Sequence, residues 1–239
     1  MTDFCTPVFS TGQTQRIALK RMLYQKQTAF QKIEVFDTEE FGRCLAIDGF
    51  VQATAKDHHL YDAVFVRHIT AQHRSVLILG GGDGFVAQAA LALNPRLKIT
   101  VVEIDAEIVN VVREFFHQTV FEDARVELVI GDAVEYLRQG GHSLFDIIFF
   151  DLTDNPLCGS VCPETFTAFY YGAFRNASMA LASGGRVVVQ AGASNTTMSY
   201  LDSAKILAAL MKACFPSVAE IHEFIPSFGE RCCFLTSIN

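Results

Sequence analysis

The chain has 239 residues, of which 50% are hydrophobic and 19% are charged. This length and composition suffice for a sizeable core and exclude a disordered or peptide-like protein. The formal net charge of -7 argues against a nucleic-acid-binding surface and fits a cationic or neutral small-molecule partner. Acidity that only aids solubility explains the same number equally well.

The N-terminus and the cysteines indicate an intracellular protein. The first residues, MTDFCTPVFS, lack the basic and apolar segments of a signal peptide, and no apolar run is long enough to span a bilayer. The seven cysteines form no CxxC pair or Cys/His array with metal-ligand spacing. We therefore expect a cytoplasmic protein with reduced, mostly buried thiols, no metal site and no membrane partner.

The N-terminal part of the chain has the pattern of a small antiparallel sheet. Apolar and polar residues alternate there, with breaks at residues 40–42 and 48–49. A helical stretch follows over residues 57–69. We place the domain boundary at this connecting helix, which gives an N-terminal β-domain of residues 1–56 and a second domain of residues 57–239.

In the second domain, buried strands alternate with amphipathic helical segments. The expected strands are residues 75–80, 98–105, 125–132, 146–151, 185–192 and 232–237, and the clearest helices are residues 106–116 and 198–215. Such apolar strands between helices predict an α/β fold with a mostly parallel sheet covered on both faces. Ligands bind such sheets beyond the carboxyl ends of the strands. Those ends carry Gly80–Gly84, Glu103–Asp105, Gly131–Asp132, Asp151–Asp154 and Gln190.

The first of these strand ends carries a glycine-rich turn, GGGDGF. Phe85 stands where the dinucleotide fingerprint has its third glycine, which disfavours a nicotinamide or flavin dinucleotide. Gly80 and Gly82, with Glu103 after the next strand, instead suit an adenosyl ligand, because glycines allow close approach and a carboxylate accepts both ribose hydroxyls. A purely structural turn is the alternative. Asp132 is placed to accept the adenine amino group and is equally suited to cap the following helix.

The acid within the glycine turn, Asp83, indicates the charge of the ligand's tail. It would repel the carboxylate of S-adenosylmethionine by about 1 kcal/mol or more at close range, whereas decarboxylated S-adenosylmethionine offers an ammonium group. Asp151 ends an apolar strand and Asp154 follows three residues later. Two such carboxylates are able to bind an amine and remove its proton, although Asp154 also suits a simple Asp-Asn-Pro turn.

Taken in order, these motifs resemble the polyamine aminopropyltransferases, the spermidine and spermine synthases. The resemblance runs from AFQKIEVF and FGRCLAIDGFVQATAKDHHLY through LILGGGDG, VVEID, IGDAVEYL and DIIFFDLTD to VVVQAG and IPSFGE. It implies an N-terminal β-domain, a Rossmann-like domain with a methyltransferase-type sheet, and a homodimer or homotetramer. It also implies decarboxylated S-adenosylmethionine as co-substrate, with no permanently bound cofactor, a small amine such as putrescine or spermidine as acceptor, and 5'-methylthioadenosine as by-product.

The resemblance assigns roles to individual positions. In the donor site Gln31 and Gln52 line the pocket. Asp83 binds the donor's amine, Glu103 binds its ribose and Asp132 binds its adenine. In the acceptor site the base that deprotonates the attacking amine is Asp151, and further lining positions are Tyr61, Asp154 and Gln190. The implied reaction is an in-line displacement: a neutral amine attacks the methylene next to the sulfonium and a thioether leaves.

Three departures from the family pattern concern the acceptor side. The family commonly reads DE..YH where this chain reads DHHLYD, so His58 replaces Glu and Asp62 replaces His or Gln. We count Asp62 among the acceptor-binding positions and expect His58 and the adjacent His59 to be solvated, with no role. The chain also has Asp-Asn-Pro at 154–156 instead of Asp-Pro, and Phe228 in place of a frequent Tyr. These changes favour a longer triamine, as in spermine and thermospermine synthases.

Two other functions remain open on the sequence. An S-adenosylmethionine-dependent methyltransferase shares the fold, the GxGxG turn and the ribose acid, but Asp83 and the β-like leader count against it. A non-catalytic polyamine-binding protein would use the acidic cleft only as a receptor. The presence together of the acids at the strand ends disfavours that reading.

Overall fold

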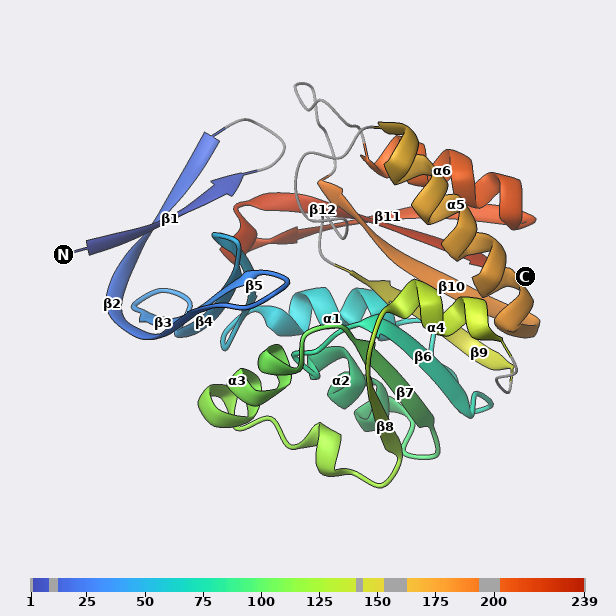
Figure 1. Ribbon diagram of the computed structural model, residues 1–239, viewed down its shortest axis with the longest axis horizontal. Coiled ribbons are helices and arrows are strands. Elements are labelled where there is room, and N and C mark those ends of the chain that lie inside the picture. The colour runs from blue at the N-terminus through green and yellow to red at the C-terminus, as the bar shows by residue number, and fades with distance from the viewer. Residues whose placement is uncertain (1, 9–12, 141–143, 153–162, 194–202, 239) are drawn as a thin grey trace.

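The computed structural model describes residues 2–8, 13–140, 144–152, 163–193 and 203–238, and these form two sheets (Figure 1). The first sheet is antiparallel, with its strands in sequence order. The expected small N-terminal antiparallel sheet is confirmed. Its strands are β1 (Thr2–Val8), β2 (Gln13–Gln27), β3 (Lys32–Thr38), β4 (Arg43–Ile47) and β5 (Phe50–Thr54).

The two faces of this first sheet pack against different neighbours. Side chains on successive strand residues point to opposite faces. Val35 and Leu45 belong to the main core of the molecule, whereas Phe36, Cys44 and Ala46 form a separate small core. One face of the sheet is therefore docked on the rest of the chain, while β1 and β2 extend away from it (Figure 1).

The second sheet has seven strands in the order β11-β12-β10-β9-β6-β7-β8. Strands β6 to β10 are parallel to one another, and β12 runs antiparallel to both β10 and β11. The prediction of a mostly parallel sheet is confirmed, and β11 is an edge strand that the sequence patterns did not single out. The strands are β6 (Ser75–Gly80), β7 (Lys98–Glu103), β8 (Val126–Ile130), β9 (Phe145–Asp151), β10 (Leu181–Ala193), β11 (Ser217–Ile225) and β12 (Glu230–Ile238).

Helices cover both faces of the second sheet. On β6, Val76 and Ile78 join one core with residues of α1, α2 and α3, while Leu77 and Leu79 join another with residues of α4, α5 and α6. No described helix combines the length and apolar character needed to cross a membrane. The helices are α1 (His58–Val66), α2 (Phe85–Leu93), α3 (Ala106–Phe116), α4 (Ala133–Gln139), α5 (Pro163–Ala180) and α6 (Ser203–Cys214), with short turns η1 (Val120–Glu122) and η2 (Pro226–Phe228).

Several expected elements agree closely with the observed ones. The strand predicted at residues 75–80 and the helix predicted at residues 106–116 have the observed bounds of β6 and α3. The helix predicted at 198–215 begins in residues outside those described, and its described part is α6. The expectation of mostly buried thiols is met by Cys44, Cys232 and Cys233, whereas Cys5 is exposed.

The strand order reverses at β6, which creates the crevice where ligands bind in such folds. From β6 the chain continues to β7 and β8 on one side, and it then returns to β9 on the other side of β6. Gly80 and Asp151, the last residues of β6 and β9, are paired neighbours in the sheet. Ligand sites are expected outside the carboxyl ends of strands at such a switch point.

Candidate active site

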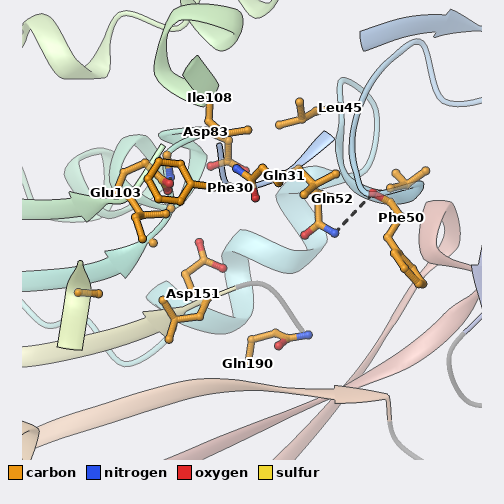
Figure 2. A pocket seen from close by; sticks show the side chains of 18 of the residues that line it. Phe30, Gln31, Leu45, Phe50, Gln52, Asp83, Glu103, Ile108, Asp151 and Gln190 are labelled. Atoms are coloured by element: carbon orange, nitrogen blue, oxygen red, sulfur yellow. Dashed lines mark hydrogen bonds between the residues drawn. The ribbon is translucent and has the colours of Figure 1, made fainter. Parts of the chain in front are cut away.

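A cavity opens over the carboxyl ends of the parallel strands, between the two sheets (Figure 2). The carboxylates of Asp83 and Asp151 and the amides of Gln52 and Gln190 lie around one space. Most of the residues predicted for the donor and acceptor sites line this cavity. They are Gln31, Gln52, Tyr61, Gly80, Gly82, Asp83, Glu103, Asp132, Asp151, Gln190 and Phe228.

Sequence reasoning missed the apolar part of the cavity wall. Strands of the N-terminal sheet contribute aliphatic and aromatic side chains, and the body of the molecule contributes others. A signal for part of it was the spacing of Leu45 and Ile47 on β4, because every second side chain of a strand points to one face. The unpredicted apolar lining residues include Phe30, Leu45, Ile47, Phe50, Val51, Ile104, Ile108 and Phe169.

The glycines of the turn are required by the chain itself. Gly80 has a φ of +82°, and a Cβ there would lie 2.2 Å from the backbone oxygen of Asp151. A Cβ on Gly82 would lie 2.6 Å from Oε2 of Glu103. These are closer than real Cβ contacts, so any larger residue must shift its neighbours. The structural explanation of the glycines therefore holds. Because they carry no side chain, their backbone is also exposed to the cavity.

Glu103, at the end of β7, is held by backbone donors. Its Oε2 accepts the N–H of Gly82 at 3.1 Å and its Oε1 accepts the N–H of Asp105 at 2.8 Å. Burial raises the pKa of Glu103 to about 7, although both hydrogen bonds oppose that rise. A carboxylate oxygen can accept more than one hydrogen bond, so this side chain is able to accept hydroxyl groups of a ligand from a fixed position.

Asp105 joins the first sheet to the site. Its Oδ2 accepts a hydrogen bond from Thr28 Oγ1 at 2.7 Å and one from Gln31 Nε2 at 3.3 Å. Its Oδ1 accepts the N–H of Glu107 at 3.0 Å and so caps α3. The sequence placed Asp105 at a strand end but assigned it no role. One buried carboxylate thus fixes both a helix start and the wall residue Gln31.

Asp57 makes a second connection, at the start of α1. It accepts hydrogen bonds from Thr54 Oγ1 at 2.6 Å and from the N–H and Oγ of Ser227 at 2.8 and 2.9 Å. Asp57 and Ser227 are both buried. Because Phe228 follows Ser227 directly, these contacts hold the cavity residue Phe228 against the N-terminal sheet.

Two acids at the switch point have raised pKa values. Asp83 accepts the N–H of Phe85 at 3.0 Å, and Asp151 accepts a hydrogen bond from the Tyr61 hydroxyl at 2.6 Å. Burial, with the nearby charge of Asp62, raises the pKa of Asp83 to about 7. Burial and the charge of Asp83 raise the pKa of Asp151 well above its usual range. The carboxylates of such acids attract a cation, and a raised pKa makes each a stronger proton acceptor.

Asp132 combines the two explanations considered for it. Its Oδ1 accepts the N–H groups of Val134 and Glu135 at 2.8 and 2.9 Å, which makes it the N-cap of α4. It also lines the cavity. The predicted cap is confirmed, and the contact with adenine stays a prediction.

The structure places Asp62 and His58 differently from the sequence expectation. Asp62 is 4% exposed and is not among the described residues that line the cavity. Its Oδ2 lies 2.6 Å from Nδ1 of His58. The expectation that His58 is solvated is wrong, because its ring is partly buried and stacks on Phe85 with centroids 4.1 Å apart. Asp154 and the Asp-Asn-Pro sequence lie outside the described residues.

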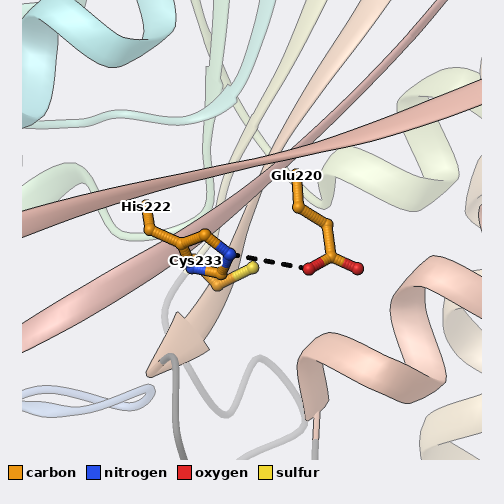
Figure 3. Close-up of side chains that lie close together, drawn as sticks. All are labelled: Glu220, His222 and Cys233. Atoms are coloured by element: carbon orange, nitrogen blue, oxygen red, sulfur yellow. Dashed lines mark ion pairs between the residues drawn. The ribbon is translucent and has the colours of Figure 1, made fainter.

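Another group of polar side chains lies at the edge of the second sheet. Glu220 and His222 on β11 and Cys233 on β12 have potential ligand atoms within 4.8 Å of one another (Figure 3). Strand pairing places His222 opposite Cys233, so sequence spacing alone did not reveal the cluster. An exposed ion pair between His222 and Glu220, 3.6 Å long, accounts for two of these side chains without a metal ion.

Comparisons with known proteins agree with this architecture. Residues 3–55 match the spermidine synthase tetramerisation domain, and residues 53–239 match the spermine/spermidine synthase domain. The chain is 32% identical to polyamine aminopropyltransferase 1 of Hyperthermus butylicus, over 88% of this chain and 72% of the relative. It is 34% identical to the polyamine aminopropyltransferase of Pyrobaculum calidifontis, over 85% of this chain and 71% of the relative.

Solved structures share the fold. Spermidine synthase from Thermotoga maritima superposes with a TM-score of 0.84 at 20% identity, over 99% of this chain and 79% of the other. A spermidine synthase in complex with the transition-state analogue AdoDATO superposes with a TM-score of 0.85 at 22% identity, over 99% of this chain and 80% of the other. The Rossmann-like fold with a small N-terminal antiparallel β-domain is therefore shown.

Proposed function

Because the chain belongs to the spermine/spermidine synthase family, we propose that it is a polyamine aminopropyltransferase. It transfers the aminopropyl group of decarboxylated S-adenosylmethionine to an amine. The observation that most supports this proposal is the pair of acids Asp83 and Asp151, which line one cavity at the switch point with raised pKa values. Such a pair suits a reaction in which both substrates carry ammonium groups.

The donor fits the part of the cavity around the glycine turn. Glu103 accepts the ribose hydroxyls and Asp132 accepts the adenine amino group, with Gln31 and Gln52 on the opposite wall. The backbone approaches the ligand at Gly82. Asp83 then binds the ammonium group of the aminopropyl chain, because a carboxylate favours a cation and disfavours the carboxylate of S-adenosylmethionine.

Asp151 serves as the base in the chemical step. An amine is protonated at neutral pH and must lose a proton before its nitrogen can attack. The C–N bond forms as the C–S bond breaks, the electron pair stays on sulfur, and a proton from the nitrogen goes to Asp151. The hydroxyl of Tyr61 orients that carboxylate from 2.6 Å. The remaining acceleration comes from alignment of the two substrates.

The amine acceptor binds at the other end of the cavity in this proposal. Gln190 and Phe228 line it there, and we keep Asp62 and Asp154 as acceptor-side residues of the proposal. Phe228 presents no hydroxyl, which favours an apolar segment of a longer triamine such as spermidine over the short diamine putrescine. Either amine is compatible with the reaction.

Product analysis tests the function. The protein is incubated with decarboxylated S-adenosylmethionine and, separately, putrescine, cadaverine, spermidine or agmatine, and products are separated by chromatography. We expect 5'-methylthioadenosine and a new polyamine, with the best amine identifying the acceptor. S-adenosylmethionine in place of the donor is the matched control and should give no transfer. Methyl transfer from it, or no product with any amine, would contradict the proposal.

We also propose that each chain has two domains, residues 1–56 and residues 57–239. We propose that the chains assemble into a homodimer or a homotetramer. The match of residues 3–55 to a tetramerisation domain supports this. Light scattering during size exclusion should give a mass that is twice or four times the chain mass of 26.4 kDa. A single-chain mass at micromolar concentration would contradict it.

A further inference from the structure

Four acidic side chains gather near the end of the cavity proposed for the donor's ammonium group, three of them lining it and one buried beside them. They come from α1, the glycine turn, β7 and β9: Asp62, Asp83, Glu103 and Asp151. The charge of Asp62 raises the pKa of Asp83, the charges of Asp83, Asp62 and Glu103 raise that of Asp151, and burial acts in the same direction. A site built only from these acids would take up protons, and a protonated carboxyl group no longer attracts an ammonium group.

His58 lies against this cluster in a place that ordinary helix electrostatics disfavours. It is the first residue of α1, where the positive end of the helix dipole opposes a cation. Its Nδ1 lies 2.6 Å from Oδ2 of Asp62, one turn later. Its ring stacks on Phe85, and the N–H of Phe85 donates to Asp83. His58 therefore contacts Asp62 directly, and it contacts Phe85, whose N–H group donates to Asp83.

We propose that His58 is a positioning residue, whose imidazolium offsets the charge of the buried Asp62 and so keeps Asp83 ionised to bind the ammonium group of the donor. This inference rests on the proposed function, since it requires a donor with an ammonium group. His58 itself touches no substrate in this scheme, and it acts through the two carboxylates.

The surrounding charges agree in sign with this role. Burial opposes the charged form of His58, but the hydrogen bond to Asp62 and the charges of Asp62, Asp83 and Asp57 outweigh it, so the pKa of His58 is raised. Burial raises the pKa of Asp62, and the positive charges that oppose this rise are those of His58 and His59. The cation that opposes the rise at Asp83 is again His58.

The decisive experiment compares His58→Gln with the wild type from pH 6 to pH 9. Glutamine can still hydrogen-bond to Asp62 but carries no charge. Without the imidazolium the acids hold their protons to higher pH, so the KM for the donor should rise at pH 6 to 7. On a plot of KM against pH, the rise at low pH (the acid limb) should move to higher pH, and KM at a given pH on this limb should increase by about tenfold for each pH unit of the move. At pH 9 the two proteins should converge, because this pH lies above the pKa of about 7 of Asp83, and its carboxyl group then ionises without help. His59→Gln, which removes an exposed neighbour, is the matched control and should move the limb little.

Binding of 5'-methylthioadenosine separates this role from a structural one. This ligand lacks the aminopropyl group, so its affinity should be equal in His58→Gln and the wild type at every pH. A loss that is constant across pH, or that affects 5'-methylthioadenosine equally, would overturn the inference. If the wild type fails to use the donor at all, the proposed function fails instead.

A second variant tests the pair without relying on turnover. In Asp62→Asn the strongest partner of the imidazolium is gone and its burial remains, so the pKa of His58, followed by NMR, should fall below its wild-type value. An unchanged pKa would show that Asp62 does not hold the charge of His58, and the inference would be abandoned. Thermal unfolding of both variants establishes that they are folded.

Discussion

At the scale of single residues, the site depends on carboxyl groups held by specific donors. Tyr61 donates to Asp151 and the backbone of Phe85 donates to Asp83. Burial works against these bonds by raising the pKa of both acids. The balance leaves both carboxyl groups with raised pKa values, and a higher pKa makes a carboxylate a stronger base for amine deprotonation.

Replacement of the proposed base gives the first prediction. Asp151→Asn should reduce kcat by about a hundredfold or more, because the amide cannot accept the proton. The affinity for 5'-methylthioadenosine should stay close to the wild-type value. Single-turnover kinetics and calorimetric titration measure the two quantities. Equal losses in binding and turnover would mean that Asp151 has been assigned the wrong role.

Glu103 provides a prediction about stability and pH. Its pKa is about 7 in the folded protein, above the ordinary value of 4.5, so the folded state binds more protons than the unfolded state between these values. Stability from this group is therefore complete below pH 4.5 and is lost as pH rises to about 7. The loss amounts to at most about 3 kcal/mol.

Glu103→Gln should remove this dependence, because glutamine does not titrate. Urea unfolding at pH 4.5, 6 and 8 measures the free energy of unfolding of both proteins. The difference, variant minus wild type, should grow more positive as pH rises, whatever its starting value. A difference that stays constant from pH 4.5 to pH 8 would show that the folded protein does not raise the pKa of Glu103.

At the scale of elements, the β6–α2 turn decides whether the site can form. Gly80 crosses the end of β9 so closely that it has no room for a side chain, and Gly82 is crowded in the same way by Glu103 at the end of β7. The same turn presents Asp83 to the cavity and begins α2 at Phe85. Local backbone geometry and the position of the ammonium-binding acid are therefore set by one short segment.

The turn can be tested with a matched pair of substitutions. Gly80→Ala forces a Cβ to within 2.2 Å of the backbone of Asp151 at a φ of +82°. We expect a loss of about 2 kcal/mol or more in the free energy of unfolding, together with loss of activity. Gly131→Ala is the control, since a Cβ there meets nothing within 4 Å. Similar unfolding midpoints in urea for the two variants would argue against strain at Gly80.

At the scale of the whole molecule, the cavity exists because the two sheets are docked together. Asp105 and Asp57 are among the polar connections, and Val35 and Leu45 are among the apolar ones. Each of the two acids accepts a hydrogen bond from a residue far away in the sequence, Thr28 for Asp105 and Ser227 for Asp57. The donor pocket is therefore complete only when the N-terminal sheet is in place.

Thr28→Val tests this docking. The change keeps the shape of the side chain but removes the hydroxyl that donates to the buried Asp105. A hydrogen bond to a charged group contributes about 1.5–3 kcal/mol, so we expect a loss of this size in urea unfolding. Binding of 5'-methylthioadenosine should weaken, because Gln31 shares the same acceptor. Thr14→Val, on an exposed part of β2, should change neither quantity.

The sequence by itself determined the fold class and most of the polar residues that line the cavity. Apolar strand runs next to glycine or acid residues mark strand ends, and the carboxyl ends of parallel strands meet at one edge. Gly82, Asp83, Glu103 and Asp151 were therefore predicted to lie together, and they do. The strand β11 escaped prediction because it lies at the edge of the sheet, where side chains are largely exposed and the apolar signal is weak.

Only the tertiary structure decided which polar groups are partners. The pairing of His58 with Asp62 conforms to helical spacing, but its burial against Phe85 depends on how α1 packs on α2. The links from Asp57 and Asp105 join residues far apart in sequence. Desolvation and hydrogen bonding act through space, so a raised pKa at Asp151 follows from the packed neighbours of that carboxyl group and from no pattern along the chain.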